Sequence, residues 1–268
     1  MTRSGMVGLA LLVLLAFFAL LGPLVAPDPA RQFDLISATL LHPSAVHWLG
    51  TDQLSRDIFA RLAGGARVSL TIGVVAVAVA GVIGSLLGLA GGALPGLGGH
   101  IVTRCIDLGL SIPRVVVLLV ILAGIGDVPP LVLGVVLGIT GWPAVARLVR
   151  GETLRLRHAL FVGAAEALGA TPGRVVSREI FPGTLPAVLV ASTLGLADAI
   201  LLEAGLSFIG VGVRPPAPSW GSMIFEARDY LASAPWLLIG PCVALVVATS
   251  AATLLGDALR QSLQPDSR

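Results

Sequence analysis

The sequence predicts an all-α polytopic membrane protein with six transmembrane helices, and its composition gives the first reason. Of the 268 residues, 56% are hydrophobic and 12% are charged, whereas soluble domains contain about 45 to 50% apolar residues, glycine included, and about 25% charged ones. The second reason is that the charged residues leave uncharged runs, each close to the ~20 apolar residues that cross a bilayer, at 4–27, 68–99, 128–146, 180–197 and 230–256. An ordinary soluble fold is therefore excluded.

The first expected helix, 4–26, could instead be a cleaved signal peptide, because Arg3 precedes it and Ala26 ends it. Its apolar core exceeds the usual ~7 to 15 residues, and Leu24 is a poor residue for a cleavage site. We therefore expect a retained membrane helix. Five further helices are expected at 68–94, 101–125, 130–148, 184–205 and 234–255.

Arginine placement indicates the orientation of these helices. With the N-terminus on the inner side, the expected inner segments hold ten arginines and the outer segments six, with Arg114 in the membrane. Positive residues concentrate in cytoplasmic segments, so we expect both termini to be cytoplasmic. All 17 basic residues are arginine, so the chain has no lysine for a P-loop. If the protein uses ATP, a different chain must bind it.

Glycines recur every fourth residue on two of the expected helices: Gly84, Gly88 and Gly92 on the second, and Gly134 and Gly138 on the fourth. Rows of glycine leave a helix face without side chains, which allows helix backbones to approach closely in lipid. Packing between helices of this chain is the simpler interpretation. A seam between two subunits is the alternative.

The outer stretch 213–220 contains three prolines and ends at Trp220, which predicts a rigid loop. Tryptophan is enriched at membrane–water boundaries, so we expect Trp48, Trp220 and Trp236 to act as interfacial anchors. A contact between this stretch and a partner protein is the alternative.

The segment 147–182 is the longest expected on the inner side. A short amphipathic helix fits its first half, where apolar and small residues recur at helical spacing: Leu160, Phe161, Ala164, Ala165, Leu168 and Gly169. Residues 171–173 then break this helix, and a second helical stretch is expected at 174–180, ending before Pro182. A basic segment lying on lipid headgroups is one interpretation. A helix docked in a groove of a partner protein is the other, and the small residues favour it.

The sequence FVGAAEALGA followed by TPGRVVSREIFPG resembles the cytoplasmic EAA loop of binding-protein-dependent ABC importer permeases. Five residues match that pattern in register: Ala164, Ala165, Gly169, Phe181 and Pro182. Two positions depart from it. Gly163 stands where the family usually has glutamate, and Glu179 stands where the broader pattern has an apolar residue. The missing acid removes one expected contact to the ATPase.

Further blocks resemble the peptide and nickel branch of this family, on the side of its second permease subunit. HWLGTDQLSRDIFARLAGGARVSL, 47–70, is similar to the GTDxxGRD segment, with Ser55 replacing the glycine. EAGLSFIGVGVRPPAPSWGSMI, 203–224, is similar to the block that ends the fifth helix. GWPAVARLVRG at 141–151 and LLGDALRQSLQP at 254–265 complete the ordered set, with Gln264 where the family prefers aspartate.

The resemblance implies a type I ABC importer permease fold in the bacterial inner membrane. It implies an N-terminal transmembrane helix and outer loop at 1–67, and a permease core at 68–268 whose coupling loop is 147–182. The implied coupling residues are Gly163, Ala164, Ala165, Gly169, Phe181 and Pro182. The implied partners are a similar second permease, two cytoplasmic ATPases that bind ATP and Mg, an external solute-binding protein and the lipid bilayer, with no nucleic acid. The solute would be a peptide or a related small molecule such as a nickel chelate. This chain would hold no cofactor or metal and would perform no catalysis.

Charged residues inside the expected helices are candidates for function, because an unpaired charge there costs at least ~2.5 to 3.5 kcal/mol. Asp107 and Arg114 are seven residues apart, which on a continuous helix allows an ion pair with each other or with neighbouring helices. Our hypothesis is that Arg114 or Asp198 faces the translocation path and contacts a charged peptide terminus. Glu203 belongs to one of the blocks above; it is interpreted as structural or gating and is the third candidate for the translocation path.

The sequence disfavours two kinds of enzyme and one other kind of transporter. A membrane serine protease is disfavoured because Phe208 follows Ser207 where a nucleophile motif needs glycine, and the four histidines fall outside or at the edges of the expected helices. Metal catalysis is disfavoured because no His or Cys pair has ligand spacing. A secondary transporter or channel is compatible with the composition, but such a carrier has no evident need of the inner helical segment.

Overall fold

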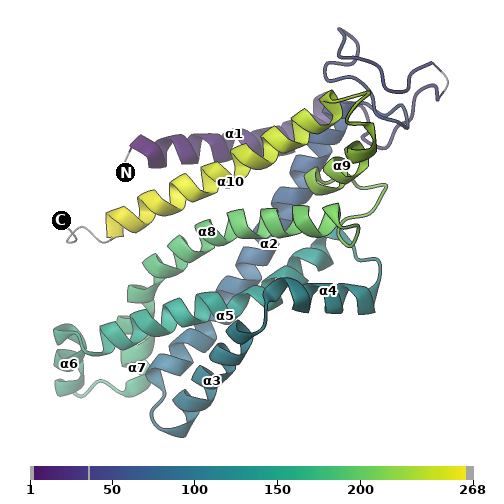
Figure 1. Ribbon diagram of the computed structural model, residues 1–268. Coiled ribbons are helices and arrows are strands. Elements are labelled where there is room, and N and C mark those ends of the chain that lie inside the picture. The colour runs from purple at the N-terminus through teal and green to yellow at the C-terminus, as the bar shows by residue number, and fades with distance from the viewer. Residues whose placement is uncertain (1–2, 36, 264–268) are drawn as a thin grey trace.

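The computed structural model describes residues 3–35 and 37–263, and in that part of the chain every regular element is a helix (Figure 1). The elements are α1 (Arg3–Val25), α2 (Ile58–Ala93), α3 (Leu97–Ser111), α4 (Arg114–Ile125), α5 (Pro130–Arg157), α6 (Leu160–Ala167), α7 (Pro172–Val175), the π-helix η1 (Val176–Ile180), α8 (Phe181–Phe208), α9 (Trp220–Ala227), the 3-10 helix η2 (Arg228–Tyr230) and α10 (Trp236–Leu263). The all-α prediction is confirmed.

Five helices are long and apolar enough to cross a membrane, and α3 with α4 makes a sixth if that bent pair counts as one span. The chain is therefore a multi-pass membrane protein, as predicted. The expected start of the second helix at residue 68 was wrong, because Asp57 caps α2 by accepting a hydrogen bond of 2.9 Å from the backbone N of Ala60. Arg61 consequently lies inside a helix rather than in the outer loop.

The third expected helix is broken at residues 112–113, where α3 and α4 meet at 83°. Pro113 lacks the N–H that a continuous helix needs, and it disfavours helical geometry in the residue before it. The bend places Asp107 and Arg114 on two helices with different axes, so the expectation of a shared helix face was wrong. Arg114 instead pairs with Asp198 of α8, and Asp107 is exposed on α3.

The two glycine stripes pack α2 against α5 within this chain. A Cβ on Gly88 would lie 2.7 Å from the backbone O of Ala146, and a Cβ on Gly138 would lie 2.8 Å from the backbone O of Ala76. Real Cβ atoms do not approach that closely, so only glycine permits this backbone contact. The structure therefore supports packing between helices of this chain as the role of these glycines.

The second half of the segment 147–182 has a structure that differs from the predicted one. The short helix is present as α6, but α7, η1 and α8 follow one another without a gap. The expectation that Pro182 ends a helix was wrong. Pro182 lies in the first turn of α8, directly after a π-helical turn whose hydrogen bonds already depart from the α pattern, so its missing N–H breaks no regular bond.

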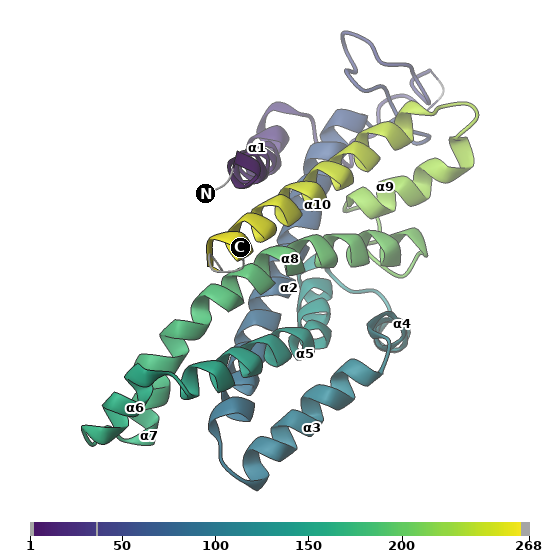
Figure 2. The same ribbon diagram turned by 60° about the vertical axis from the view of Figure 1, so that its left-hand side comes forward.

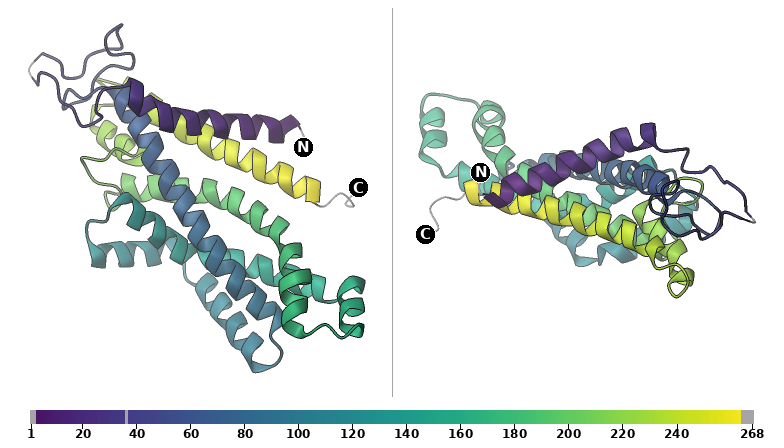
Figure 3. Two further views of the ribbon diagram at one scale, coloured as in Figure 1. Left: turned by 180° about the vertical axis from the view of Figure 1, so that it is seen from behind. Right: turned by 90° about the horizontal axis from the view of Figure 1, so that it is seen from above.

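The two ends of the described chain lie at the same end of the molecule as α6 and α7, whereas the segment 27–57 lies at the opposite end (Figures 2 and 3). α1 packs along α10: a Cβ on Gly8 would lie 2.7 Å from the backbone O of Ala251. This packing is the one expected of a retained helix. The last two residues of the tail block, 264–265, lie outside the described residues.

Candidate functional site

A cavity of about 420 Å³ lies between α2, α4, α5 and α8, in the middle of the helical bundle. Its wall is mostly alanine, glycine and valine, and its polar lining residues are Arg114, Ser192 and Asp198. Sites that bind small molecules are typically concave, about 300 to 1,000 Å³ in volume, and apolar with a few polar groups. This cavity fits that description, and it brings together two of the three residues that we assigned to a translocation path.

The Arg114 guanidinium is held in place mainly by α5. Its Nη2 donates to the backbone O of Leu137 at 2.7 Å, and its Nε lies 3.4 Å from Oγ1 of Thr140. Gly141 leaves room for the group, since a Cβ there would lie 2.9 Å from Nη2. Its Nη1 lies 2.5 Å from Oδ2 of Asp198. The ion pair therefore links α4 to α8 across the cavity.

Glu203 is not part of this cavity. It lies five residues beyond Asp198 on α8, about 140° around the helix at 3.6 residues per turn, and it is fully buried. Its carboxyl accepts hydrogen bonds from Oγ of Ser69 on α2 at 3.0 Å and Oγ of Ser207 at 2.7 Å. Ser69 Oγ also accepts from the backbone N of Trp220 at 3.2 Å. Glu203 thus joins α2, α8 and α9, which agrees with its interpretation as structural or gating rather than with a place on the path.

A second cavity, of about 620 Å³, continues from the first along α8. Ala191 and Leu194 line both cavities. Its charged lining residues lie near the C-terminal ends of α5 and α10: Glu152, Arg155 and Arg260. The two cavities therefore adjoin along α8, and the second lies toward the end of the molecule that carries α6.

The implied coupling residues lie on a small exposed surface. Leu160 and Leu168 are 94% and 89% exposed, and a Cβ added at Gly163 or Gly169 would have no neighbour within 4 Å. Only Val162 anchors α6, by packing into a buried apolar cluster with Leu156, Val175 and Ile180. Ala164 and Pro182 are exposed, Ala165 is half-buried, and Phe181 is 39% exposed. Leu160 and Leu168 lie outside the helices that are long enough to span a membrane, and apolar side chains this exposed mark a surface that contacts another protein or a membrane.

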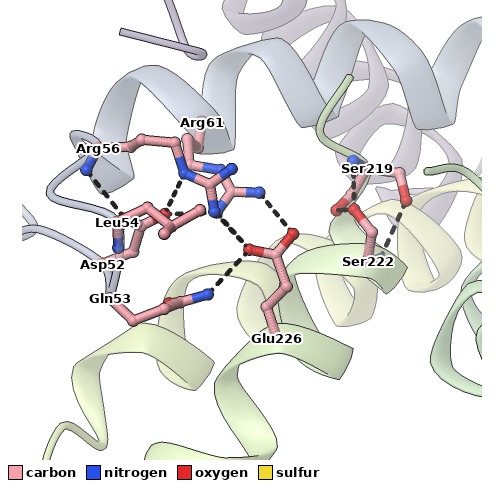
Figure 4. Close-up of polar contacts among 8 residues, drawn as sticks. All are labelled: Asp52, Gln53, Leu54, Arg56, Arg61, Ser219, Ser222 and Glu226. Carbon is pink, nitrogen blue, oxygen red and sulfur yellow. Dashed lines mark hydrogen bonds and ion pairs between the residues drawn. The ribbon is translucent and has the colours of Figure 1, made fainter. Parts of the chain in front are cut away.

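A charge network that sequence reasoning missed ties the outer loop to α9 (Figure 4). Asp52 Oδ2 lies 2.7 Å from Nε of Arg56 and 2.5 Å from Nη1 of Arg61. Glu226 Oε2 lies 2.6 Å from Nη2 of Arg56 and 2.7 Å from Nη1 of Arg61. Gln53 Nε2 donates to Glu226 at 3.3 Å. Two acids and two arginines balance, so the cluster can be buried without an unpaired charge.

The arginines determine the protonation of the network's most accessible acid. Burial alone would raise the pKa of Glu226, but hydrogen bonds and charge from Arg61 and Arg56 outweigh burial, and this pKa lies below its ordinary value. The sequence signal for the loop half of the network was the GTDxxGRD block. Nothing in the sequence connected that block to Glu226, which is 165 residues away from Arg61.

Trp220 begins α9 and is fully buried, so the expectation that it anchors the chain at the membrane boundary was wrong. Its Nε1 donates to the backbone O of Leu62 at 3.2 Å, which satisfies the indole in the interior. A reciprocal pair of hydrogen bonds between Ser219 and Ser222 caps the helix (Figure 4). Trp48, in contrast, is exposed.

Comparison with known proteins identifies the family. The family described as binding-protein-dependent transport system inner membrane component matches residues 80–268. The family described as N-terminal TM domain of oligopeptide transport permease C matches residues 2–43. These two regions cover most of the chain.

Three relatives illustrate the similarity. A protein of Brucella suis biovar 1 assigned as a peptide permease is 40% identical, over 98% of this chain and 87% of its own length. The glutathione transport system permease protein GsiD of Pectobacterium atrosepticum is 36% identical, over 95% and 83%. The dipeptide transport system permease protein DppC of Alkalihalophilus pseudofirmus is 35% identical, over 98% and 86%. The chain belongs to the family of binding-protein-dependent transport system inner membrane components.

Proposed function

We propose that this chain is a permease subunit of an ATP-driven importer of short peptides. The observation that carries the proposal is the exposed apolar surface of α6 on a chain that has no lysine for a P-loop. A permease that is powered by separate ATPases needs such a surface outside the membrane. Relatives named for dipeptide and glutathione transport support a peptide as the solute rather than a nickel chelate.

In this proposal a cytoplasmic ATPase binds α6 and the start of α8. The contact residues would be Gly163, Ala164, Ala165, Gly169, Phe181 and Pro182. A second permease subunit would close the open side of the cavity that holds Arg114 and Asp198, and an external binding protein would deliver the solute at the end that carries segment 27–57. The ATPases, not this chain, would bind ATP and Mg. Both termini would then be cytoplasmic.

Reconstitution tests the proposal. The chain, its second permease and its ATPases are placed in proteoliposomes with the binding protein, and uptake of radiolabelled dialanine is measured with and without ATP. We expect accumulation only with ATP, and loss of accumulation in a Leu160→Asp, Leu168→Asp variant that no longer binds the ATPases. Uphill uptake without ATPases would overturn the proposal and favour a secondary transporter.

A further inference from the structure

The two partners of the intramembrane ion pair are held very differently. Arg114 uses three of its nitrogens on Leu137, Thr140 and Asp198. Asp198 uses only Oδ2, and Oδ1 has no hydrogen-bond partner in the described part of the chain. The side chain of Asp198 is 57% exposed, against 27% for Arg114. The arginine is therefore fixed on α5, and the carboxylate has free acceptor capacity.

This asymmetry decides which charge the cavity can accept. A carboxylate has about four lone-pair positions, so a cation can bind Oδ1 while Oδ2 stays on Arg114. An anion is disfavoured, because three of the five N–H donors of Arg114 are already used and its side chain is about half as exposed as that of Asp198. Because the rest of the wall is apolar apart from Ser192, a charge-assisted hydrogen bond to Asp198 is worth more here than in water.

We propose that Asp198 binds the α-ammonium group of the transported peptide, and that Arg114 is a positioning residue that holds the carboxylate in place. The remainder of the peptide would extend from the first cavity toward the second, past Ala191 and Leu194, which line both. Its carboxylate would then point toward the end that carries Arg260 and the Arg155–Glu152 ion pair. The inference rests on the proposed function, because it places the cavity on the path of the solute.

The first test measures protection of Asp198 in the assembled wild-type transporter in nanodiscs, without binding protein, so that recognition by the binding protein does not enter. A water-soluble diazo reagent esterifies accessible carboxyl groups, and mass spectrometry quantifies the ester on each residue. Dialanine amide carries only the ammonium, and N-acetyl-dialanine carries only the carboxylate. Asp127 is the matched control, since it pairs with Arg214 but lies outside the cavity.

We expect dialanine amide to slow esterification of Asp198 several-fold, N-acetyl-dialanine to have no effect, and Asp127 to respond to neither. Equal protection by both probes, protection by the acetylated probe alone, or no protection by either would overturn the proposal. The assay uses no ATP and no uptake. Its failure is thus separate from failure of the proposed function, which the ATP-driven uptake of dialanine by the wild-type complex tests.

A set of variants distinguishes substrate binding from simple neutralisation of Arg114. Asp198→Asn is expected to lower the initial rate of dialanine uptake about tenfold or more, the size expected for one lost charged hydrogen bond, and Asp198→Glu to recover part of it. The double variant Arg114→Gln, Asp198→Asn has no unpaired charge. We expect it to stay as low as Asp198→Asn. Recovery in the double variant, or an unchanged rate in Asp198→Asn, would overturn the proposal, and co-purification with the second permease checks assembly.

Discussion

Oγ of Ser69 on α2 donates a hydrogen bond of 3.0 Å to Oε2 of Glu203 on α8, and the same hydroxyl accepts from the backbone N of Trp220 on α9. Three helices thus meet at one buried carboxyl group that has no cation beside it among the described residues. The contact is made entirely by hydroxyl and amide groups, which a neutral side chain can serve equally well.

Two substitutions of Glu203 therefore distinguish the contribution of its hydrogen bonds and packing from that of its charge. Glu203→Gln keeps an acceptor and adds a donor that Ser69 or Ser207 can accept, so we expect an assembled protein with a thermal midpoint near that of the wild type. Glu203→Ala leaves buried serine hydroxyls without a hydrogen-bond acceptor and creates a cavity. We expect this change to lower the free energy of unfolding by about 2 kcal/mol or more. Thermal unfolding in detergent, followed by fluorescence-detected size exclusion, measures both. If the glutamine variant is as damaged as the alanine variant, the charge itself is required.

Ser55 carries two local penalties that glycine would remove. Its φ is +54°, in the left-handed region, and its buried Oγ has no hydrogen-bond partner. We expect Ser55→Gly to stabilise the outer loop by about 1 kcal/mol or more and to raise the thermal midpoint. Ser55→Ala is the matched control, because it removes the hydroxyl and keeps the strained Cβ, so its gain should be smaller. A midpoint that falls in the glycine variant would contradict this account.

The low pKa of Glu226 predicts how the outer network responds to acid. A carboxyl whose pKa is lower in the folded than in the unfolded chain adds stability above the unfolded value, and this stability is lost as the pH falls through the folded value. Glu226→Gln leaves two buried arginines short of a partner and should lower the thermal midpoint at pH 7. The gap between wild type and variant should begin to narrow as the pH falls below about 4.5, the ordinary pKa of glutamate, and should close as the pH falls through the lower pKa of the folded protein.

Asp229→Asn serves as the control for the Glu226 experiment, because Asp229 is an exposed carboxylate whose ion pair with Arg228 lies at the surface. Exposed pairs contribute little to stability, so this variant should unfold at the wild-type temperature at every pH. A gap between wild type and Glu226→Gln that stays constant down to pH 3.5 would show that the carboxylate charge does not matter to the network.

The glycines of α2 and of α6 should respond in opposite ways to the same change. Gly88→Ala forces a methyl group to within 2.7 Å of the Ala146 carbonyl oxygen, and overpacking of this kind typically costs about 1 to 3 kcal/mol. Gly163→Ala meets open space and removes a helix-interior glycine, which favours the helix by up to about 1 kcal/mol. Yield and thermal midpoint should fall in the first variant only. Equal losses in both would indicate that glycine is needed at 163 for a reason other than space.

Several of these features could be read from the sequence because they depend on local patterns. Uncharged runs located the spanning helices, and the spacing of Leu160, Ala164 and Leu168 located α6. The spacing of Gly84, Gly88 and Gly92 indicated close packing. The residues of the ATPase-coupling surface stay a prediction, since its exposure fits the assignment and no contact with an ATPase tests it.

Other features depend on contacts between residues that are distant in the chain. Apolar residues stand on both sides of Pro113, the residue that breaks this helix, but the angle of 83° between α3 and α4 could not be read from the sequence. The partner of Arg114 proved to be Asp198, 84 residues away, rather than Asp107. Tryptophan is a residue type typical of interfacial anchors, but Trp220 lies in the interior. There its Nε1 donates a hydrogen bond to the backbone O of Leu62 and its backbone N donates to Oγ of Ser69.

η1 runs into α8 without a gap, so the segment 172–180 and the spanning helix form one continuous helical backbone. Asp198 lies 17 residues beyond Phe181, which is about 26 Å at 1.5 Å per residue. If an ATPase tilted η1 by about 10°, simple geometry would carry the far carboxylate sideways by roughly 4 Å. That displacement exceeds the reach of an ion pair, so a tilt transmitted along the run without bending would separate Asp198 from Arg114.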